Sequence, residues 1–170
     1  MATRAEQLDD GCCGESYCAA PTTENAARQC PRCGTRGRSV ERLTVAALTT
    51  GTVPADPPYR LCRRLDCEVV YFGEKGATIT ASGLHVSPGM KSKAPEALLC
   101  YCFQYNRGDI EAELAAAGAT TIPERIAAEV KAGNCACEVR NPSGRCCLGD
   151  VQEAVEEIRA RLDTCEKVTR

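Results

Sequence analysis

The chain has 170 residues, of which 26% are charged, and a formal net charge of −2. The near balance of acidic and basic residues argues against a nucleic-acid-binding protein. No apolar run approaches the roughly 18 residues of a membrane span, which rules out membrane insertion. Aromatic residues make up 4% of the chain and tryptophan is absent, so small units need a further source of stability. Fourteen cysteines beside one histidine predict that metals bound through sulfur supply it.

The start of the chain bears on the redox state of these thiols. Residues 1–15, MATRAEQLDDGCCGE, contain no apolar segment of the kind found in secretory signals. A cytoplasmic protein with reduced thiols is therefore expected, in which grouped cysteines indicate metal or redox chemistry. The alternative is a secreted domain held together by disulfides.

The first two parts of the chain differ in their patterning. Residues 1–29 form a polar leader without apolar periodicity, and we predict it to be flexible. Residues 30–94 are rich in β-branched residues and turn formers, which indicates a β-rich unit. The polar stretch 87–95 is typical of a linker. Short strands are predicted over residues 39–45, 67–72 and 77–81.

Residues 95–170 have a helical pattern. A first helix is predicted between a cap at Asp109 and a stop at Gly118. A second helix opens with a capping box at Thr121 and a third opens at Asp150, each with a glutamate three residues further on. The fold class is therefore α+β, with a β-rich unit followed by a small helical unit.

The β-rich unit carries two cysteine pairs. In the first, Cys30-Pro-Arg-Cys33, two intervening residues let both thiolates face one ion, and Gly34 permits the tight backbone that follows. Cys62 and Cys67 supply a second pair. Four thiolates predict a closed tetrahedral zinc site. The alternative is that these cysteines are unliganded and buried.

The helical unit carries a different pattern. Cys100 and Cys102 form a CxC pair, which suits one iron of a [2Fe–2S] cluster, with a distal pair on the second iron. Cys147 directly precedes a helix, whose positive end stabilises an anionic cluster. A second zinc site is the alternative. The candidates for the distal pair are Cys135, Cys137, Cys146 and Cys147.

Four strings carry a resemblance to a known family: CPRCG at 30–34, CEVVYF at 67–72, CYC at 100–102 and NPSGRCC at 141–147. The helical unit resembles the [2Fe–2S] domain of bacterioferritin-associated ferredoxins. The chain from about residue 30 to 165 is more similar to the amino-terminal region of CopZ-type iron–sulfur copper chaperones. The resemblance implies zinc at Cys30, Cys33, Cys62 and Cys67, and a [2Fe–2S] cluster at Cys100, Cys102, Cys137 and Cys147.

That family also has a ferredoxin-like domain with a CxxC loop for Cu(I), and the sequence ends at Arg170 without one. The leader thiols are therefore candidates to bind the transferred soft metal, because Cu(I) favours thiolate ligands. These thiols are Cys12, Cys13 and Cys18. The alternative is a reactive or merely tolerated tail. Replacement of Cys135, Cys146 or Cys165 is expected to leave the cluster largely intact, and Cys146 is expected to be able to substitute in part for the adjacent Cys147.

Two functions follow from these patterns. The first is a soluble metal-trafficking protein, similar to a copper chaperone, which reduces a soft metal ion by one electron and passes it on, with a metal-transporting P-type ATPase as one partner. The second is a ferredoxin-like electron carrier for a reductase or an iron-storage protein. Neither makes the protein an enzyme, because the sequence has no nucleophile–base set and no phosphate loop. His85 is expected to be exposed and without a role.

Overall fold

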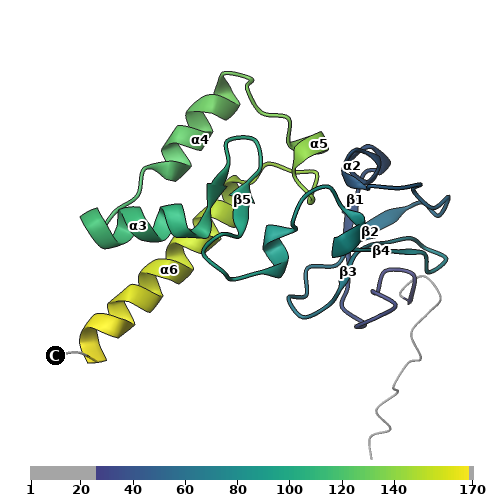
Figure 1. Cartoon of the computed structure of the whole chain (residues 1–170), viewed down its shortest axis with the longest axis horizontal. Coiled ribbons are helices and arrows are strands. Elements are labelled where there is room, and N and C mark those ends of the chain that lie inside the picture. The colour runs from purple at the N-terminus through teal and green to yellow at the C-terminus, as the bar shows by residue number, and fades with distance from the viewer. Residues whose placement is uncertain (1–25, 169–170) are drawn as a thin grey trace, which may run out of the picture.

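The computed structural model describes residues 26–168 and shows a small sheet unit joined to a helical unit (Figure 1). The α+β class predicted from the sequence is confirmed. Residues 1–25, which make up most of the predicted leader, lie outside the described residues. Within the described part, no helix combines the length and apolar character that a membrane span requires.

The sheet unit is built on four short antiparallel strands in the order β1-β2-β3-β4. Every residue of β3 is buried, so this strand forms the centre of the unit. The predicted strands over 67–72 and 77–81 are confirmed as β3 and β4, each somewhat shorter. The bounds are β1 Arg38–Val40, β2 Tyr59–Leu61, β3 Val69–Phe72 and β4 Thr78–Thr80.

The strand predicted over residues 39–45 is wrong beyond Val40. The chain turns there into helix α2, Arg42–Leu48, whose buried residues are Thr44, Val45 and Leu48. Their spacing places them on one face of a helix. Burial of that face against the sheet therefore overrides the β propensity of the threonine and valine. The same segment supplies Val45 and Leu48 to the core of the sheet unit.

The segment 87–95, predicted as a linker, is instead packed against the helical unit. It contains the short 3₁₀ helix Gly89–Lys91, and both Pro88 and Gly89 are buried. The hydroxyl of Tyr101 donates to the carbonyl of Ser87 at 2.8 Å and accepts from the amide of Gly89 at 2.7 Å. These bonds fix the segment to the hairpin that follows it.

A substitution at Gly89 tests this packing. A Cβ added there would lie 1.8 Å from the carbonyl oxygen of Leu98, so the backbone of one segment must move. We expect Gly89→Ala to lower the free energy of unfolding by about 2 kcal/mol or more, measured by denaturant titration. Gly51→Ala is the control, because no atom lies within 4 Å of its added Cβ. Equal midpoints for the two variants would refute the close packing.

The helical unit begins with a hairpin and continues with four helices, and the hairpin and three of these helices pack around one apolar cluster. Residues of the hairpin, α3, α4 and α6 share this cluster, and Ile110, Ile122, Ile126 and Val151 are fully buried in it. The elements are β5 Leu98–Cys100, β6 Tyr105–Asn106, α3 Arg107–Ala117, α4 Ile122–Lys131, α5 Cys137–Arg140 and α6 Leu148–Val168.

The helix ends differ from the prediction in detail. Asn106 caps α3 and forms a reciprocal capping box with Asp109, so Asp109 is the third helical residue and not the cap. Gly118 ends α3 in the left-handed conformation as predicted, with φ of 70°. The capping box predicted at Thr121 is wrong, because its side chain makes no cap bond. Helix α6 begins at Leu148, two residues before the predicted Asp150.

Candidate metal centres

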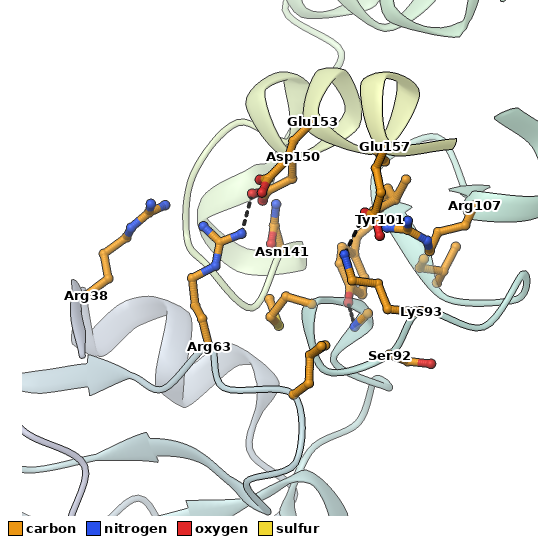
Figure 2. A pocket seen from close by; sticks show the side chains of 16 residues that line it. Arg38, Arg63, Ser92, Lys93, Tyr101, Arg107, Asn141, Asp150, Glu153 and Glu157 are labelled. Carbon is orange, nitrogen blue, oxygen red and sulfur yellow. Dashed lines mark hydrogen bonds and ion pairs between the residues drawn. The ribbon is translucent and has the colours of Figure 1, made fainter. Parts of the chain in front are cut away.

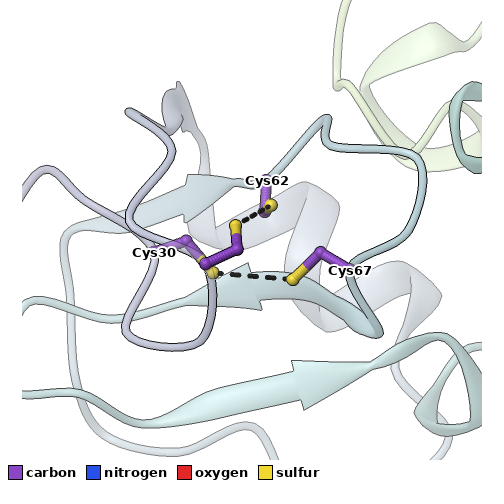
Figure 3. A group of neighbouring side chains, drawn as sticks. Cys30, Cys62 and Cys67 are labelled. Carbon is purple, nitrogen blue, oxygen red and sulfur yellow. Dashed lines mark hydrogen bonds between the residues drawn. The ribbon is translucent and has the colours of Figure 1, made fainter.

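Four cysteines from two separate segments of the sheet unit come together at one point (Figure 3). Cys30 and Cys33 lie in a turn before β1, Cys62 directly follows β2, and Cys67 lies just before β3. All four Sγ atoms lie within 4.8 Å of one another. The structure therefore brings together the set that the sequence predicts for zinc.

The separations between these sulfurs fit one tetrahedral ion. Cys33 Sγ lies 3.6 Å from Cys62 Sγ, and Cys30 Sγ lies 3.9 Å from Cys67 Sγ. Four thiolates at about 2.3 Å from zinc have neighbouring sulfurs about 3.8 Å apart. The four thiols thus have both the chemistry and the spacing of a closed structural zinc site.

The turn that holds the first pair is tight. The amide of Gly34 donates to the carbonyl of Cys30 at 2.8 Å, and the amide of Cys30 donates to the carbonyl of Thr35 at 2.9 Å. Gly34 has φ of 71°, a conformation that a residue with a Cβ rarely adopts. This backbone requires glycine after Cys33, as the CxxCG pattern predicts.

The thiols of this group differ in acidity. Burial raises the pKa of Cys30 to about 12. At Cys33 burial acts in the same direction, but hydrogen bonds from the hydroxyl and amide of Thr35 outweigh it and lower the pKa to about 6. Cys33 is thus the more acidic of the two thiols, and Cys30 is the one that must lose a proton to bind metal. Metal binding therefore releases protons, and metal affinity falls as the pH falls.

A second group of thiols lies in the helical unit. Cys100 ends β5, Cys102 lies in the turn of the hairpin, Cys137 begins α5, and Cys147 directly precedes α6. Cys102 is half-buried, whereas the other three are buried. These are the four residues that the family resemblance implies for a cluster.

The second group is arranged as two pairs. Cys102 Sγ lies 3.8 Å from Cys137 Sγ, and Cys100 and Cys147 are near enough for each to shift the pKa of the other. Each pair joins one cysteine of the CxC motif to one distal cysteine. The sequence-based expectation, in which the CxC pair holds one iron and the distal pair the other, differs from this pairing.

This arrangement bears on the choice between a second zinc and a cluster. Among the residues that the structure describes, only the first group has its thiols within 4.8 Å of one another. Two close pairs that do not form one compact set suit two irons bridged by sulfide better than a single tetrahedral ion. The amide of Ala136 donates to Cys102 Sγ at 3.3 Å, a contact that stabilises negative charge on sulfur. The donor set therefore fits a [2Fe–2S] cluster.

The interaction between Cys100 and Cys147 makes the two thiols differ in acidity. It is the main cause that lowers the pKa of Cys100 to about 6, and amides of Phe103 and Cys102 add to the effect. The same interaction, followed by burial, raises the pKa of Cys147. Cys100 is therefore the more acidic thiol of the two.

The other candidate thiols lie elsewhere. Cys135 is half-buried and Cys146 is exposed, and neither takes part in the two pairs. The leader thiols Cys12, Cys13 and Cys18, and the side chain of Cys165, lie outside the described part of the chain. His85 is exposed, as expected.

The residues that connect the two units were not predicted from the sequence. A cavity of about 440 Å³ is lined by side chains of α6 and of the sheet unit (Figure 2). Arg63 and Asp150 form an ion pair across it at 2.7 Å. Glu157 accepts hydrogen bonds from Lys93 and Arg107 at 2.6 and 2.8 Å. The cavity has no cysteine or histidine in its lining, and the Arg63–Asp150 ion pair across it joins the sheet unit to α6.

A small antiparallel sheet with a four-thiol site, followed by a helical unit with two thiol pairs, defines a cysteine-rich metal-binding protein. Residues 27–85 match the family model zf_CopZ, described as a zinc binding domain. The chain is 30% identical over 156 residues to the copper chaperone CopZ of Archaeoglobus fulgidus, covering 81% of this chain and 72% of that protein. The chain therefore belongs to the CopZ family of copper chaperones.

A solved structure agrees with this assignment. The crystal structure of the N-terminal domain of Archaeoglobus fulgidus CopZ matches with a TM-score of 0.59 and 29% identity. The match covers 74% of this chain and 95% of the other. The likeness thus extends beyond residues 27–85 into the helical unit.

Proposed function

We propose that this protein is a copper-trafficking chaperone that carries two resident metal centres. A structural zinc is bound by Cys30, Cys33, Cys62 and Cys67, and a [2Fe–2S] cluster is bound by Cys100, Cys102, Cys137 and Cys147. The observation that carries the proposal is the difference in arrangement between the two thiol groups. One forms a compact set within 4.8 Å, and the other is divided into pairs, one of them 3.8 Å apart.

The zinc has a structural role in this proposal. Cys30, Cys62 and Cys67 are buried, and together with Phe72 they form their own small core cluster. A closed four-thiolate site leaves no open position for a substrate. Its effect is to join the turn before β1 to the two central strands.

The helical unit carries the redox chemistry. When bound, the cluster supplies one electron, which converts Cu(II) to Cu(I). Its protein ligands are buried except for Cys102, so the hairpin turn is the side nearest to solvent. An incoming copper ion or an electron-donating partner approaches at that turn.

The leader receives the product. Cys12, Cys13 and Cys18 provide soft ligands that prefer Cu(I) and are not required by either resident centre. We infer a cytoplasmic carrier that passes Cu(I) to a metal-transporting P-type ATPase, and no catalytic turnover is assigned to it.

The proposal is tested by copper reduction without oxygen. Protein reduced with dithionite and freed of excess reductant is mixed with Cu(II), and the absorbance of the cluster is followed. We expect re-oxidation of about one cluster per copper ion, because each partner exchanges one electron. A variant with serine at positions 12, 13 and 18 should reduce copper equally well but lose Cu(I) to a competing chelator.

Two results would change the assignment. If the serine variant holds Cu(I) as tightly as the parent, the leader is not the transfer site. If the reduced cluster does not react with Cu(II), the protein is better described as a one-electron carrier for a reductase or an iron-storage protein.

A further inference from the structure

The turn between two of the cluster ligands is attached to the sheet unit. Residues 141–144 connect α5, which begins at Cys137, to Cys147. The hydroxyl of Tyr71, in the centre of β3, donates to the carbonyl of Pro142 at 2.8 Å. Tyr71 is 0% exposed, so this bond is shielded from water. Burial raises the pKa of Tyr71, and the hydroxyl keeps its proton for this bond.

The turn itself is rigid. Asn141 is 2% exposed; its Oδ1 accepts from the amide of Ser143 and its Nδ2 donates to the carbonyl of Arg145, both at 2.9 Å. Gly144 has φ of 65° and lies against α2, where an added Cβ would be 2.6 Å from Thr44 Oγ1. Because these contacts hold the turn together, fixing the position of Pro142 also fixes the residues at the two ends of the turn.

A second tether joins the sheet unit to the chain just beyond the turn. Arg63, the residue directly after Cys62, forms the 2.7 Å ion pair with Asp150, three residues beyond Cys147. Figure 2 shows this pair beside Asn141. In the chain, both tethers therefore start near a proposed zinc ligand and end near a proposed cluster ligand. Tyr71 follows Cys67 by four residues.

We propose that the zinc-bound sheet unit is the support that positions Cys137 and Cys147 for the cluster, with Tyr71 as the main positioning residue. This inference rests on the proposed function for the identity of the cluster. The hydrogen bond of Tyr71 goes to Pro142 and not to a ligand. It acts by fixing Pro142 between the two thiols, and the ion pair of Arg63 adds a weaker, partly exposed restraint.

The test removes the hydroxyl of Tyr71 and compares the effect with removal of the hydroxyl of a second buried tyrosine. Tyr71→Phe removes the bond and leaves the Pro142 carbonyl buried without a partner. Tyr59→Phe is the control: the Tyr59 hydroxyl also donates to a proline carbonyl, that of Pro54, and the side chain is 2% exposed. That bond lies wholly within the sheet unit and does not reach the turn.

Two readouts are compared in full-length parent and variants. The first is the rate at which an iron chelator bleaches the cluster without oxygen, with zinc content measured in parallel. We expect Tyr71→Phe to bleach roughly five- to a hundredfold faster at unchanged zinc content, the factor that an unsatisfied buried carbonyl implies, and Tyr59→Phe to match the parent. The second readout is amide hydrogen exchange over residues 141–147, which should increase in Tyr71→Phe alone.

The outcomes separate the inference from the proposed function. Equal bleaching and equal exchange in Tyr71→Phe and the parent would overturn the inference, as would the same increase in both variants, which indicates a general loss of stability. A parent protein without iron would refute the proposed cluster. In that case the exchange measurement still decides whether Tyr71 holds the turn between Cys137 and Cys147.

Discussion

Protein carrying Cys62→Ser is expected to be isolated without zinc and with its four-stranded sheet unfolded. Cys62 is fully buried directly after β2, and its sulfur lies 3.6 Å from that of Cys33. Structural zinc sites contribute about 10–16 kcal/mol of apparent binding free energy. A sheet with strands of three or four residues has no comparable source of stability.

The measurement is elemental analysis after gel filtration, with circular dichroism and amide chemical-shift dispersion to follow the sheet. Cys146→Ser is the control, since that thiol is exposed and lies outside both groups. A folded Cys62→Ser protein that still holds one zinc per chain would show that the ion is bound elsewhere.

The second large effect concerns the cluster ligands. Cys100→Ser and Cys147→Ser are each expected to abolish the visible absorption of the [2Fe–2S] centre and the EPR signal of its reduced form. The two thiols interact with each other and are 0% and 2% exposed, and serine at either position removes one of the four proposed ligands.

Cys135→Ser and Cys146→Ser provide the comparison, because each removes a thiol adjacent to the group but outside its pairs. Both should keep their colour. A colourless Cys135→Ser protein beside a coloured Cys137→Ser protein would show that Cys135 is the ligand and that the 3.8 Å contact of Cys137 with Cys102 has another role.

The sequence indicated the local structure well where a single residue type determines it. Gly118 ends α3 in a left-handed conformation, and Gly34 has the positive φ that the turn after Cys33 requires. Such positions can be predicted from the sequence because few residues other than glycine adopt these conformations. The β-branched strand β3 was predictable for a similar reason, since its burial on both faces produces a continuous apolar run.

Other parts depend on contacts between distant segments, which periodicity does not reveal. The helix α2 forms because Val45 and Leu48 pack into the core of the sheet unit. The segment around Gly89 is ordered by Tyr101. Sequence spacing alone had suggested a strand in the first case and a linker in the second.

The candidate metal centres likewise combine features that the sequence predicts with features that depend on contacts between distant segments. Spacing within CPRC predicted two thiols that the structure does bring together at one point, because close ligands need few intervening residues. The pairing of Cys102 with Cys137 could not be read from the sequence, since it depends on how α5 lies against the hairpin. The support that Tyr71 gives to Pro142 is likewise a contact between the two units.

The most direct test of the account is the metal content of the wild-type protein purified without oxygen, combined with EPR after one-electron reduction. The account predicts about one zinc, two irons and two acid-labile sulfides per chain, with a reduced-state signal typical of a [2Fe–2S] centre. Two zinc ions with neither iron nor sulfide would contradict it, because both thiol groups would then hold redox-inactive structural ions.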